Sequence, residues 1–166
     1  MTNNLIYKTA KELLDLFEHK EASPVEVIKG VLKRVEERDR DINAFILVDE
    51  ESALAQARDS EERWSKGNPK GLLDGIPISI KDMILTKGWP TLRGSRTIDP
   101  AGPWEEDAPC VARVREHGAV IFGKTTMSEF GWKGVGDCEL TGITRNPWNL
   151  DKTPGGSSGG ASAALA

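Results

Sequence analysis

Apolar residues recur every three or four positions near the start of the chain, which is the spacing of an amphipathic helix. The first such helix is predicted over residues 9–18. A second begins at Ser23, Pro24 and Glu26, which supply an N-cap serine, a proline in the first turn and a capping-box glutamate. The apolar positions of this second helix are Val27, Ile28, Val31, Leu32 and Val35. Both patterns predict surface helices that rest on a core.

Short apolar runs follow, too short for helices and rich in strand formers. Residues 42–48, INAFILV, predict a strand, and a polar helix is expected over residues 52–64. A second strand is predicted over residues 76–80, within GLLDGIPISIKDMILT. Residues 87–104 are rich in Gly, Pro, Ser and Thr, which favours a loop over the surface.

The next segment predicts a helix followed directly by a strand. Asp107 is expected to cap a helix that runs through His117, and Gly118 is placed to stop it. The run AVIFG, residues 119–123, then predicts a buried strand, and a short helix is expected from Thr125 or Thr126. Strand, helix and strand in this order predict an α/β fold with helices on the faces of the sheet.

Composition narrows the functional classes. The chain has 166 residues, of which 38% are hydrophobic and 29% charged, with a net charge of −4. One domain is expected from this length, and the weak acidity argues against a nucleic-acid partner. No apolar run approaches the ~20 residues that span a bilayer, and no signal peptide is visible, so a cytoplasmic protein is expected. Cys110 and Cys138 lie far apart without metal-ligand spacing, which favours reduced thiols and no metal.

The histidines do not favour a conventional serine triad. His19 and His117 lie at or near helix ends, where structural roles are expected. Lysine is the other base that can activate a serine. Lys81 directly follows the apolar run IPISI, at the end of a predicted strand, and burial there would lower its pKa toward the range of a working base. The alternative is that Lys81 reaches solvent or pairs with Asp82.

The segment TPGGSSGGASAALA, residues 153–166, places two serines among four glycines. A phosphate-binding loop would end in Gly-Lys-Ser/Thr, whereas here Gly160 is followed by Ala161. A flexible linker is the other alternative, but the preceding NPW and the helix formers that follow favour ordered structure. The glycines are therefore expected to give the two hydroxyls an unusual backbone geometry.

Four motifs together resemble one known family. GIPISIKD, GKTTMSEF, NPWNL and TPGGSSGG occur in the order and approximate spacing of the amidase signature family, and the resemblance covers nearly the whole chain. It implies a mixed sheet covered by helices on both faces. It also implies that Lys81 and Ser157 are catalytic, with a cis peptide between Gly156 and Ser157. Ser158 would support the loop through a hydrogen bond, and Met127 would lie near the substrate.

The resemblance further implies amide hydrolysis through a Ser–cis-Ser–Lys relay without a cofactor. In the family, the nucleophilic serine lies in a D-x-G-G-S motif further downstream, which residues 1–166 do not contain. We therefore expect the chain to be the N-terminal portion of a single amidase domain that ends before the nucleophile, and to be inactive by itself.

Three functional interpretations stay open. The first is a stand-alone amidase that acts on a small-molecule amide, with no nucleic acid or membrane partner, as a monomer or a homodimer. The second is the A subunit of a glutamine-dependent tRNA amidotransferase. Met83, PTLRGSR and EFGWKGVGD favour the stand-alone enzyme. The third is a non-catalytic module whose Gly-Ser loop binds an anion.

Overall fold

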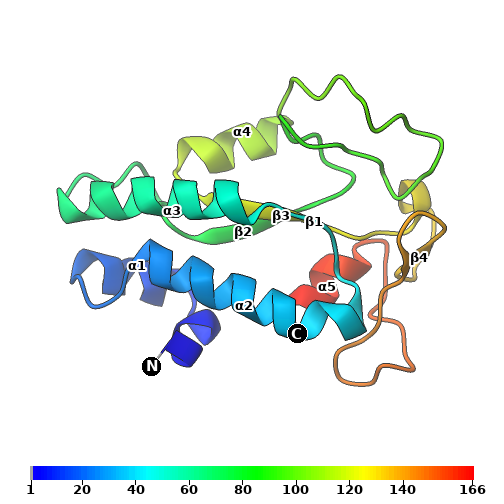
Figure 1. The fold of residues 1–166 in the computed structure, drawn as a ribbon, viewed down its shortest axis with the longest axis horizontal. Helices are drawn as coiled ribbons and strands as arrows, with labels where there is room; N and C mark the ends of the chain where they lie inside the picture. Colours follow the sequence, from blue (N-terminus) through cyan, green and yellow to red (C-terminus); the bar gives the residue numbers. More distant parts are fainter. Residues whose placement is uncertain (1) are drawn as a thin grey trace. The chain divides into compact units, whose positions relative to one another are not determined.

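Helices and short strands make up the fold of residues 2–166, the part of the chain that the computed structural model describes (Figure 1). The elements are η1 (Thr2–Tyr7), α1 (Ala10–Glu18), α2 (Pro24–Ile42), β1 (Phe45–Val48), α3 (Glu50–Ser65), β2 (Pro77–Lys81), α4 (Pro109–Glu116), β3 (Val120–Thr125), η2 (Glu129–Gly131), β4 (Asp137–Cys138), β5 (Gly142–Ile143) and α5 (Gly159–Leu165). The long segment between β2 and α4 has no helix or strand, as its composition predicts.

The chain folds as two compact units. The first unit comprises residues 2–37, 49–78 and 112–122, and the second comprises residues 38–48, 79–111 and 123–166. β2 and β3 each begin in the first unit and end in the second.

Local capping decides where the first helices begin. Thr9 caps α1, and the Glu12 side chain accepts a hydrogen bond from the Thr9 N–H at 2.8 Å. At α2, the Ser23 N–H donates to the Glu26 carboxylate at 2.9 Å, and the Glu26 N–H donates to the Ser23 hydroxyl at 3.2 Å. These reciprocal bonds satisfy N–H groups that have no partner within the helix. The predicted capping box at Ser23 is confirmed.

The core of the first unit gathers the apolar faces of α1 and α2. Its buried members are Leu13, Phe17, Val27 and Ile76. Trp64 of α3 packs against it, with the Phe17 and Trp64 ring centroids 5.9 Å apart and their planes inclined by 57°. This tilted arrangement is one that aromatic rings prefer.

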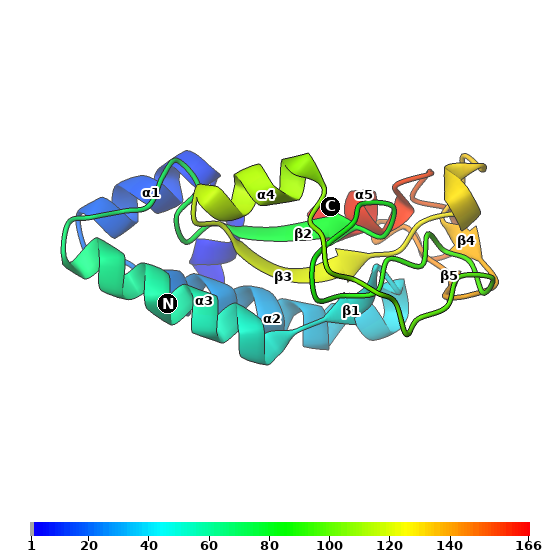
Figure 2. The same ribbon diagram turned by 90° about the horizontal axis from the view of Figure 1, so that it is seen from above.

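β3 is the central strand of a three-stranded sheet in the order β1-β3-β2. β1 pairs antiparallel with β3. The Val120 N–H at the start of β3 donates to the carbonyl of Ile76, the residue before β2. The N–H of Asp82, the residue after β2, donates to the Thr125 carbonyl at the end of β3. β2 and β3 therefore run parallel, and the sheet is mixed. Within the first unit, the beginnings of both strands run between α2 and α4 in the two views of the fold (Figures 1 and 2). The predicted α/β class, with a strand–helix–strand unit, is confirmed.

Two predicted boundaries are wrong, at Ile42 and at Thr125. Ile42 is the last residue of α2 rather than the start of a strand, because Asn43 turns the chain with φ of 58° and the Asp39 carboxylate accepts the Ala44 N–H at 2.6 Å. β3 continues through Thr125, so no α-helix begins there. Instead, a single 3-10 turn starts at Glu129.

α4 ends at the predicted glycine, but it begins later than expected. Gly118 has φ of +83°, a conformation that favours glycine, and the Ala119 N–H returns to the Val114 carbonyl at 3.2 Å. The helix begins at Pro109, and the Asp107 carboxylate accepts the Lys87 N–H at 2.7 Å. Asp107 therefore ties the end of the long loop to its beginning.

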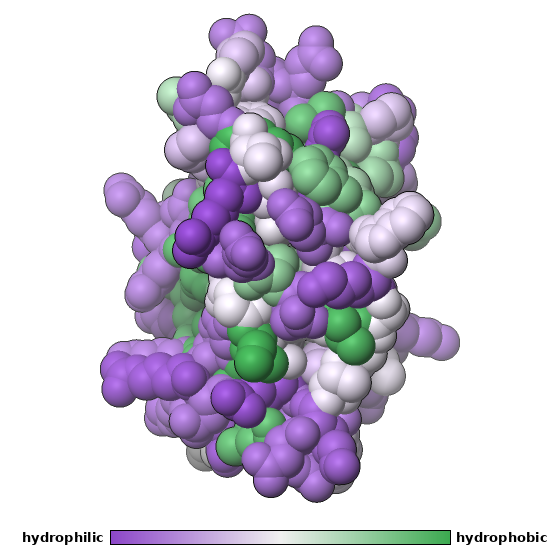
Figure 3. Space-filling model, turned by 90° about the vertical axis from the view of Figure 1, so that its right-hand side faces the viewer, coloured by the Kyte–Doolittle hydropathy of each residue, from purple (hydrophilic) through white to green (hydrophobic). Residues whose placement is uncertain are grey.

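Figure 3 shows one face on which hydrophobic side chains form small patches separated by hydrophilic ones. No helix within residues 2–166 has both the length and the apolar character needed to cross a bilayer.

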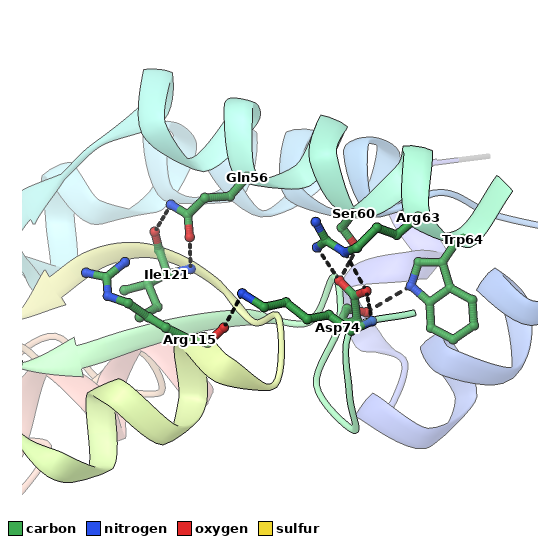
Figure 4. Close-up of polar contacts among 8 residues, drawn as sticks. Gln56, Ser60, Arg63, Trp64, Asp74, Arg115 and Ile121 are labelled. Carbon is green, nitrogen blue, oxygen red and sulfur yellow. Dashed lines mark hydrogen bonds and ion pairs between the residues drawn. The ribbon is translucent and has the colours of Figure 1, made fainter. Parts of the chain in front are cut away.

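A glutamine of α3 replaces a strand partner for part of β3. The Gln56 amide nitrogen donates to the Ile121 carbonyl at 3.0 Å, and the Ile121 N–H donates to the Gln56 side-chain oxygen at 3.1 Å (Figure 4). One side chain thus satisfies both backbone groups of a fully buried strand residue, as buried polar groups require.

Candidate active site

Lys81 and Ser157, which lie 76 positions apart, come into direct contact within the second unit. The Lys81 ammonium Nζ donates a hydrogen bond to the Ser157 hydroxyl Oγ at 2.8 Å. Lys81 is the last residue of β2, and Ser157 lies in the turn that leads into α5. Both residues are partly buried. The contact joins the end of a sheet strand to the beginning of a helix.

Burial lowers the pKa of the Lys81 ammonium below its ordinary value. The alternative pairing with Asp82 is not formed, because the Asp82 carboxylate lies 3.1 Å from the ammonium of Lys124 instead. Partial removal from water favours the neutral amine, which is the form that can accept a proton.

The Gly-Ser segment is packed rather than flexible. The peptide bond between Gly156 and Ser157 is cis, as the resemblance implies. The Ser128 N–H donates to the Ser157 carbonyl at 3.3 Å. A Cβ atom added to Gly156 would lie 2.5 Å from both the backbone N and O of Val135. The segment therefore has a defined place beside residues 128–135, which excludes a free linker.

Ser158 and Met127 also lie in this unit, and their predicted roles stay predictions. Ser158 occupies the N-cap position of α5 without a side-chain capping bond, and its carbonyl accepts the Ser162 N–H at 3.0 Å. Met127 is 1% exposed, so its side chain belongs to the buried interior of the described chain.

Neither histidine takes part in this contact. His19 Nδ1 lies 2.8 Å from the Asp15 carbonyl, whose hydrogen bond raises the pKa of His19. His117 Nδ1 accepts the Leu72 N–H at 3.2 Å. All of these bonds lie within the first unit, in keeping with the structural roles that helix-end positions predict.

Sequence reasoning missed a second buried lysine. Lys124 of β3 is 0% exposed, and burial lowers its pKa while the Asp82 charge opposes that shift. Its ammonium donates to the Thr91 hydroxyl at 2.6 Å and to the Pro90 carbonyl at 2.8 Å. The Lys124 ammonium is thus directed at Asp82, Pro90 and Thr91, whereas the Lys81 ammonium donates to the Ser157 hydroxyl. A lysine inside the apolar run AVIFGKT was the available signal.

Sequence reasoning also missed the backbone opposite Ser157. A Cβ atom built on Gly131 would lie 3.5 Å from Ser157 Oγ and 3.1 Å from the methyl carbon of Met83. Gly131 therefore borders the hydroxyl that Lys81 contacts, and Met83 packs against Gly131.

Within residues 2–166, no group of three His, Cys, Asp or Glu side chains is placed to hold a metal ion. Cys110 and Cys138 are both free thiols, one exposed and one buried.

Comparison with known proteins gives a consistent result. A sequence model of the Amidase family matches residues 26–166. The chain is 43% identical over 158 residues to the A subunit of the glutamyl-tRNA(Gln) amidotransferase of Salinispora tropica, a match that covers 95% of this chain and 32% of that protein. Against the corresponding protein of Alkaliphilus metalliredigens, identity is 45% over 142 residues, covering 85% of this chain and 28% of that one.

Solved structures are similar as well. The native peptide amidase of Stenotrophomonas maltophilia superposes with a TM-score of 0.88 at 30% identity, covering 96% of this chain and 34% of that one. A bacterial aryl acylamidase of the amidase signature enzymes superposes with a TM-score of 0.84 at 32% identity, covering 96% and 33%. The chain thus spans about a third of the length of the proteins that it matches.

Proposed function

Because this chain belongs to the amidase signature family, we propose that it supplies Lys81 and Ser157 to an enzyme that hydrolyses a small-molecule amide. Enzymes of the family act on C–N bonds. The observation that carries the proposal is the 2.8 Å contact between Lys81 Nζ and Ser157 Oγ, formed where burial lowers the pKa of the lysine.

The chemistry follows from that contact. Neutral Lys81 accepts the proton of the Ser157 hydroxyl, and Ser157 accepts the proton of a nucleophilic serine as that oxygen bonds to the amide carbonyl carbon. The relay then returns a proton to the departing amine as the C–N bond breaks. Water hydrolyses the resulting acyl-enzyme by the same relay in reverse, and no cofactor is needed.

The proposal places the nucleophile and its oxyanion donors beyond residue 166, in the downstream Gly-Ser motif that the resemblance implies. The relatives are about three times as long as this chain, which leaves room for that motif. Residues 1–166 are then the N-terminal portion of a single amidase domain. Gly156 allows the close approach to Val135, Ser158 supports the turn, and Met127 borders the substrate.

Substitution of the two contacting residues in the full-length protein tests the proposal. Lys81→Ala and Ser157→Ala should each lower kcat/KM for a hydrolysable amide by at least about 100-fold, the scale of a lost general acid–base group. Exposed residues of the first unit provide the controls Lys29→Ala and Ser65→Ala, which should retain wild-type rates. Near-normal rates in both Lys81→Ala and Ser157→Ala would exclude the relay.

A second candidate is the A subunit of a glutamine-dependent tRNA amidotransferase. It is favoured by the names of the curated relatives, at 40–45% identity. In that function the same amide chemistry acts on glutamine, and the ammonia released is passed to misacylated tRNA.

Purification of the full-length protein from its own cells separates the candidates. Stable partner subunits together with glutaminase activity would favour the amidotransferase. A protein that purifies as a monomer or homodimer and hydrolyses other amides would favour the stand-alone enzyme. Phosphate-dependent protection of residues 153–160 in hydrogen exchange, without reaction with a serine-directed inhibitor, would instead favour the anion-binding module.

A further inference from the structure

A buried ion pair includes Asp82, the residue that directly follows Lys81. Lys124 Nζ and Asp82 Oδ1 are 3.1 Å apart, with the two side chains 0% and 1% exposed. Two further acceptors, the Pro90 carbonyl and the Thr91 hydroxyl, complete the three donors of the ammonium. Burying such a pair has a desolvation cost, and apolar side chains of similar volume often stabilise a core as well. Stability alone is therefore a weak reason for its presence.

Asp82 connects this pair to the strand end that carries Lys81. Its N–H donates to the Thr125 carbonyl at 3.1 Å, which fixes the backbone immediately after Lys81 to the end of β3. Lys124 is the preceding residue of β3. The position at which the Lys81 side chain leaves the sheet is thus set by the residues of the ion pair.

The Asp82 carboxylate also holds the loop that follows. It accepts the Leu92 N–H at 3.3 Å and the Gly94 N–H at 3.2 Å, while its backbone carbonyl accepts the Arg93 N–H at 3.1 Å. Lys124 bonds the two preceding loop residues. Residues 90–94 therefore lie against the ion pair, and four of their polar groups bond to its two side chains.

The same loop holds the segment beside Ser157. The Arg93 carbonyl accepts the Phe130 N–H at 2.8 Å, and the Ser95 hydroxyl donates to the Glu129 carboxylate at 2.6 Å. These bonds fix the 3-10 turn whose Gly131 faces the Ser157 hydroxyl. The residue before that turn, Ser128, donates its N–H to the Ser157 carbonyl.

We propose that the Lys124–Asp82 ion pair is a positioning device for the catalytic contact, which sets the separation of Lys81 Nζ and Ser157 Oγ without touching the substrate. One chain of contacts runs from Asp82 through the backbone to Lys81. The other runs through residues 90–95 and the turn at 129–131 to Ser157. The catalytic consequence rests on the proposed function, but the geometric consequence does not.

The test uses the full-length protein with both charges removed together. Removing one partner leaves an uncompensated buried charge, which is strongly destabilising and threatens folding. The double variant Asp82→Asn/Lys124→Met keeps the side-chain volumes, so we expect it to fold. Its asparagine has one acceptor oxygen and cannot bind both the Leu92 and Gly94 N–H groups as the carboxylate does. The matched control is Lys33→Met/Glu37→Gln, which removes an exposed ion pair of α2.

Two readouts distinguish positioning from a merely structural role. The first is the pH dependence of acetylation at Lys81 with acetic anhydride, quantified by mass spectrometry, which requires no turnover. In the double variant, the midpoint of Lys81 labelling should rise by about one pH unit as the amine becomes more hydrated. The second is steady-state kinetics, where kcat should fall by about 10- to 100-fold with KM within twofold, the cost of misplacing a catalytic group by ~1 Å.

Each outcome decides a separate point. A folded double variant with unchanged Lys81 labelling and unchanged kcat overturns the positioning role. If labelling shifts while Lys81→Ala retains normal activity, the positioning role stands and the proposed function fails. If the double variant does not fold, Thr91→Val decides the question, since it removes one bond of Lys124 and should shift Lys81 labelling in the same direction. No shift in a folded Thr91→Val variant then overturns the proposal.

Discussion

At the scale of single residues, Gly160, the second glycine after the serine pair, is required by contact distance. A Cβ atom on Gly160 would meet the Ala44 carbonyl oxygen and would lie 2.5 Å from the Thr126 backbone nitrogen. The Gly160 N–H also donates to the Thr126 carbonyl at 3.1 Å. Gly160 is thus a point of close approach between the start of α5 and the end of β3.

Gly160→Ala should therefore destabilise the protein. The added methyl group would force backbone segments apart, and overpacking of this kind costs about 1–3 kcal/mol. Urea unfolding measures the change. Gly134→Ala is the matched control, because no atom lies within 4 Å of a Cβ built at that position. Equal stability of the two variants would show that the α5 contact can relax.

The partly buried amine of Lys81 predicts the direction of a pH profile. Because only neutral Lys81 accepts a proton, kcat/KM should rise with pH and level off above the pKa of this amine. Burial lowers that pKa, so the midpoint should lie below the ordinary lysine value of about 10.4. Lys81→Arg should be inactive across the range, since the guanidinium stays protonated. A midpoint at or above the ordinary lysine value would contradict the assigned role.

At the scale of helices and strands, one aspartate ties α3 to the turn before β2 in the first unit. Asp74 is 0% exposed and accepts hydrogen bonds from Arg63 at 2.6 and 2.9 Å and from the Ser60 hydroxyl at 2.7 Å. The Lys70 N–H donates to the same carboxylate at 2.6 Å, and the Trp64 indole donates to the Asp74 carbonyl at 3.1 Å (Figure 4).

This network predicts a loss of stability in acid. Burial by itself raises the pKa of Asp74, but the hydrogen bonds from Arg63, Lys70 and Ser60 together hold it below its ordinary value. The stabilisation is therefore present above the unfolded-state pKa of about 4 and is lost as pH falls through the lower folded-state pKa. Asp74→Asn should lower the free energy of unfolding at neutral pH by about 3 kcal/mol and flatten its acid dependence.

Glu12 also contributes to the acid dependence of the free energy of unfolding, so its contribution needs a separate control variant. A hydrogen bond from the Thr9 N–H and the neighbouring Lys8 ammonium lower the pKa of this exposed carboxylate to about 2. Its cap at α1 is therefore lost in the same direction as pH falls. Glu12→Gln removes that contribution and leaves the Asp74 network intact. If the remaining acid dependence disappears in Glu12→Gln but persists in Asp74→Asn, the assignment to Asp74 is wrong.

At the scale of the whole molecule, the described residues contain Lys81 and Ser157, the two residues of the proposed proton relay, but no assigned nucleophile. Ser95 donates to Glu129 at 2.6 Å and Ser128 donates to the Lys133 carbonyl at 3.0 Å, so both hydroxyls serve local structure. The purified chain of residues 1–166 should therefore show no amide hydrolysis above that of its Lys81→Ala variant. Turnover that Lys81→Ala abolishes would place the nucleophile within these residues.

The helix starts and the strand–helix–strand order could be read from the sequence because their causes are local. The capping box at Ser23 and Glu26 spans four residues, and Gly118 stops α4 through its own backbone freedom. Boundaries failed where a distant or irregular feature intervened, as at Asn43 with its positive φ. The interval between IKD and GGSSGG indicated a family, and the family resemblance suggested that Lys81 and Ser157 meet.

The sequence by itself therefore determined the α/β class, the family and the two residues proposed for the relay. Only the tertiary structure decided which charges pair. Asp82 forms its ion pair with Lys124 rather than with its neighbour Lys81, and the Lys81 ammonium donates a hydrogen bond to the Ser157 hydroxyl. The physical reason is that Lys81 ends β2 while Asp82 lies in the turn that follows, so their partners depend on burial and on segments far apart in the sequence, which local patterns do not determine.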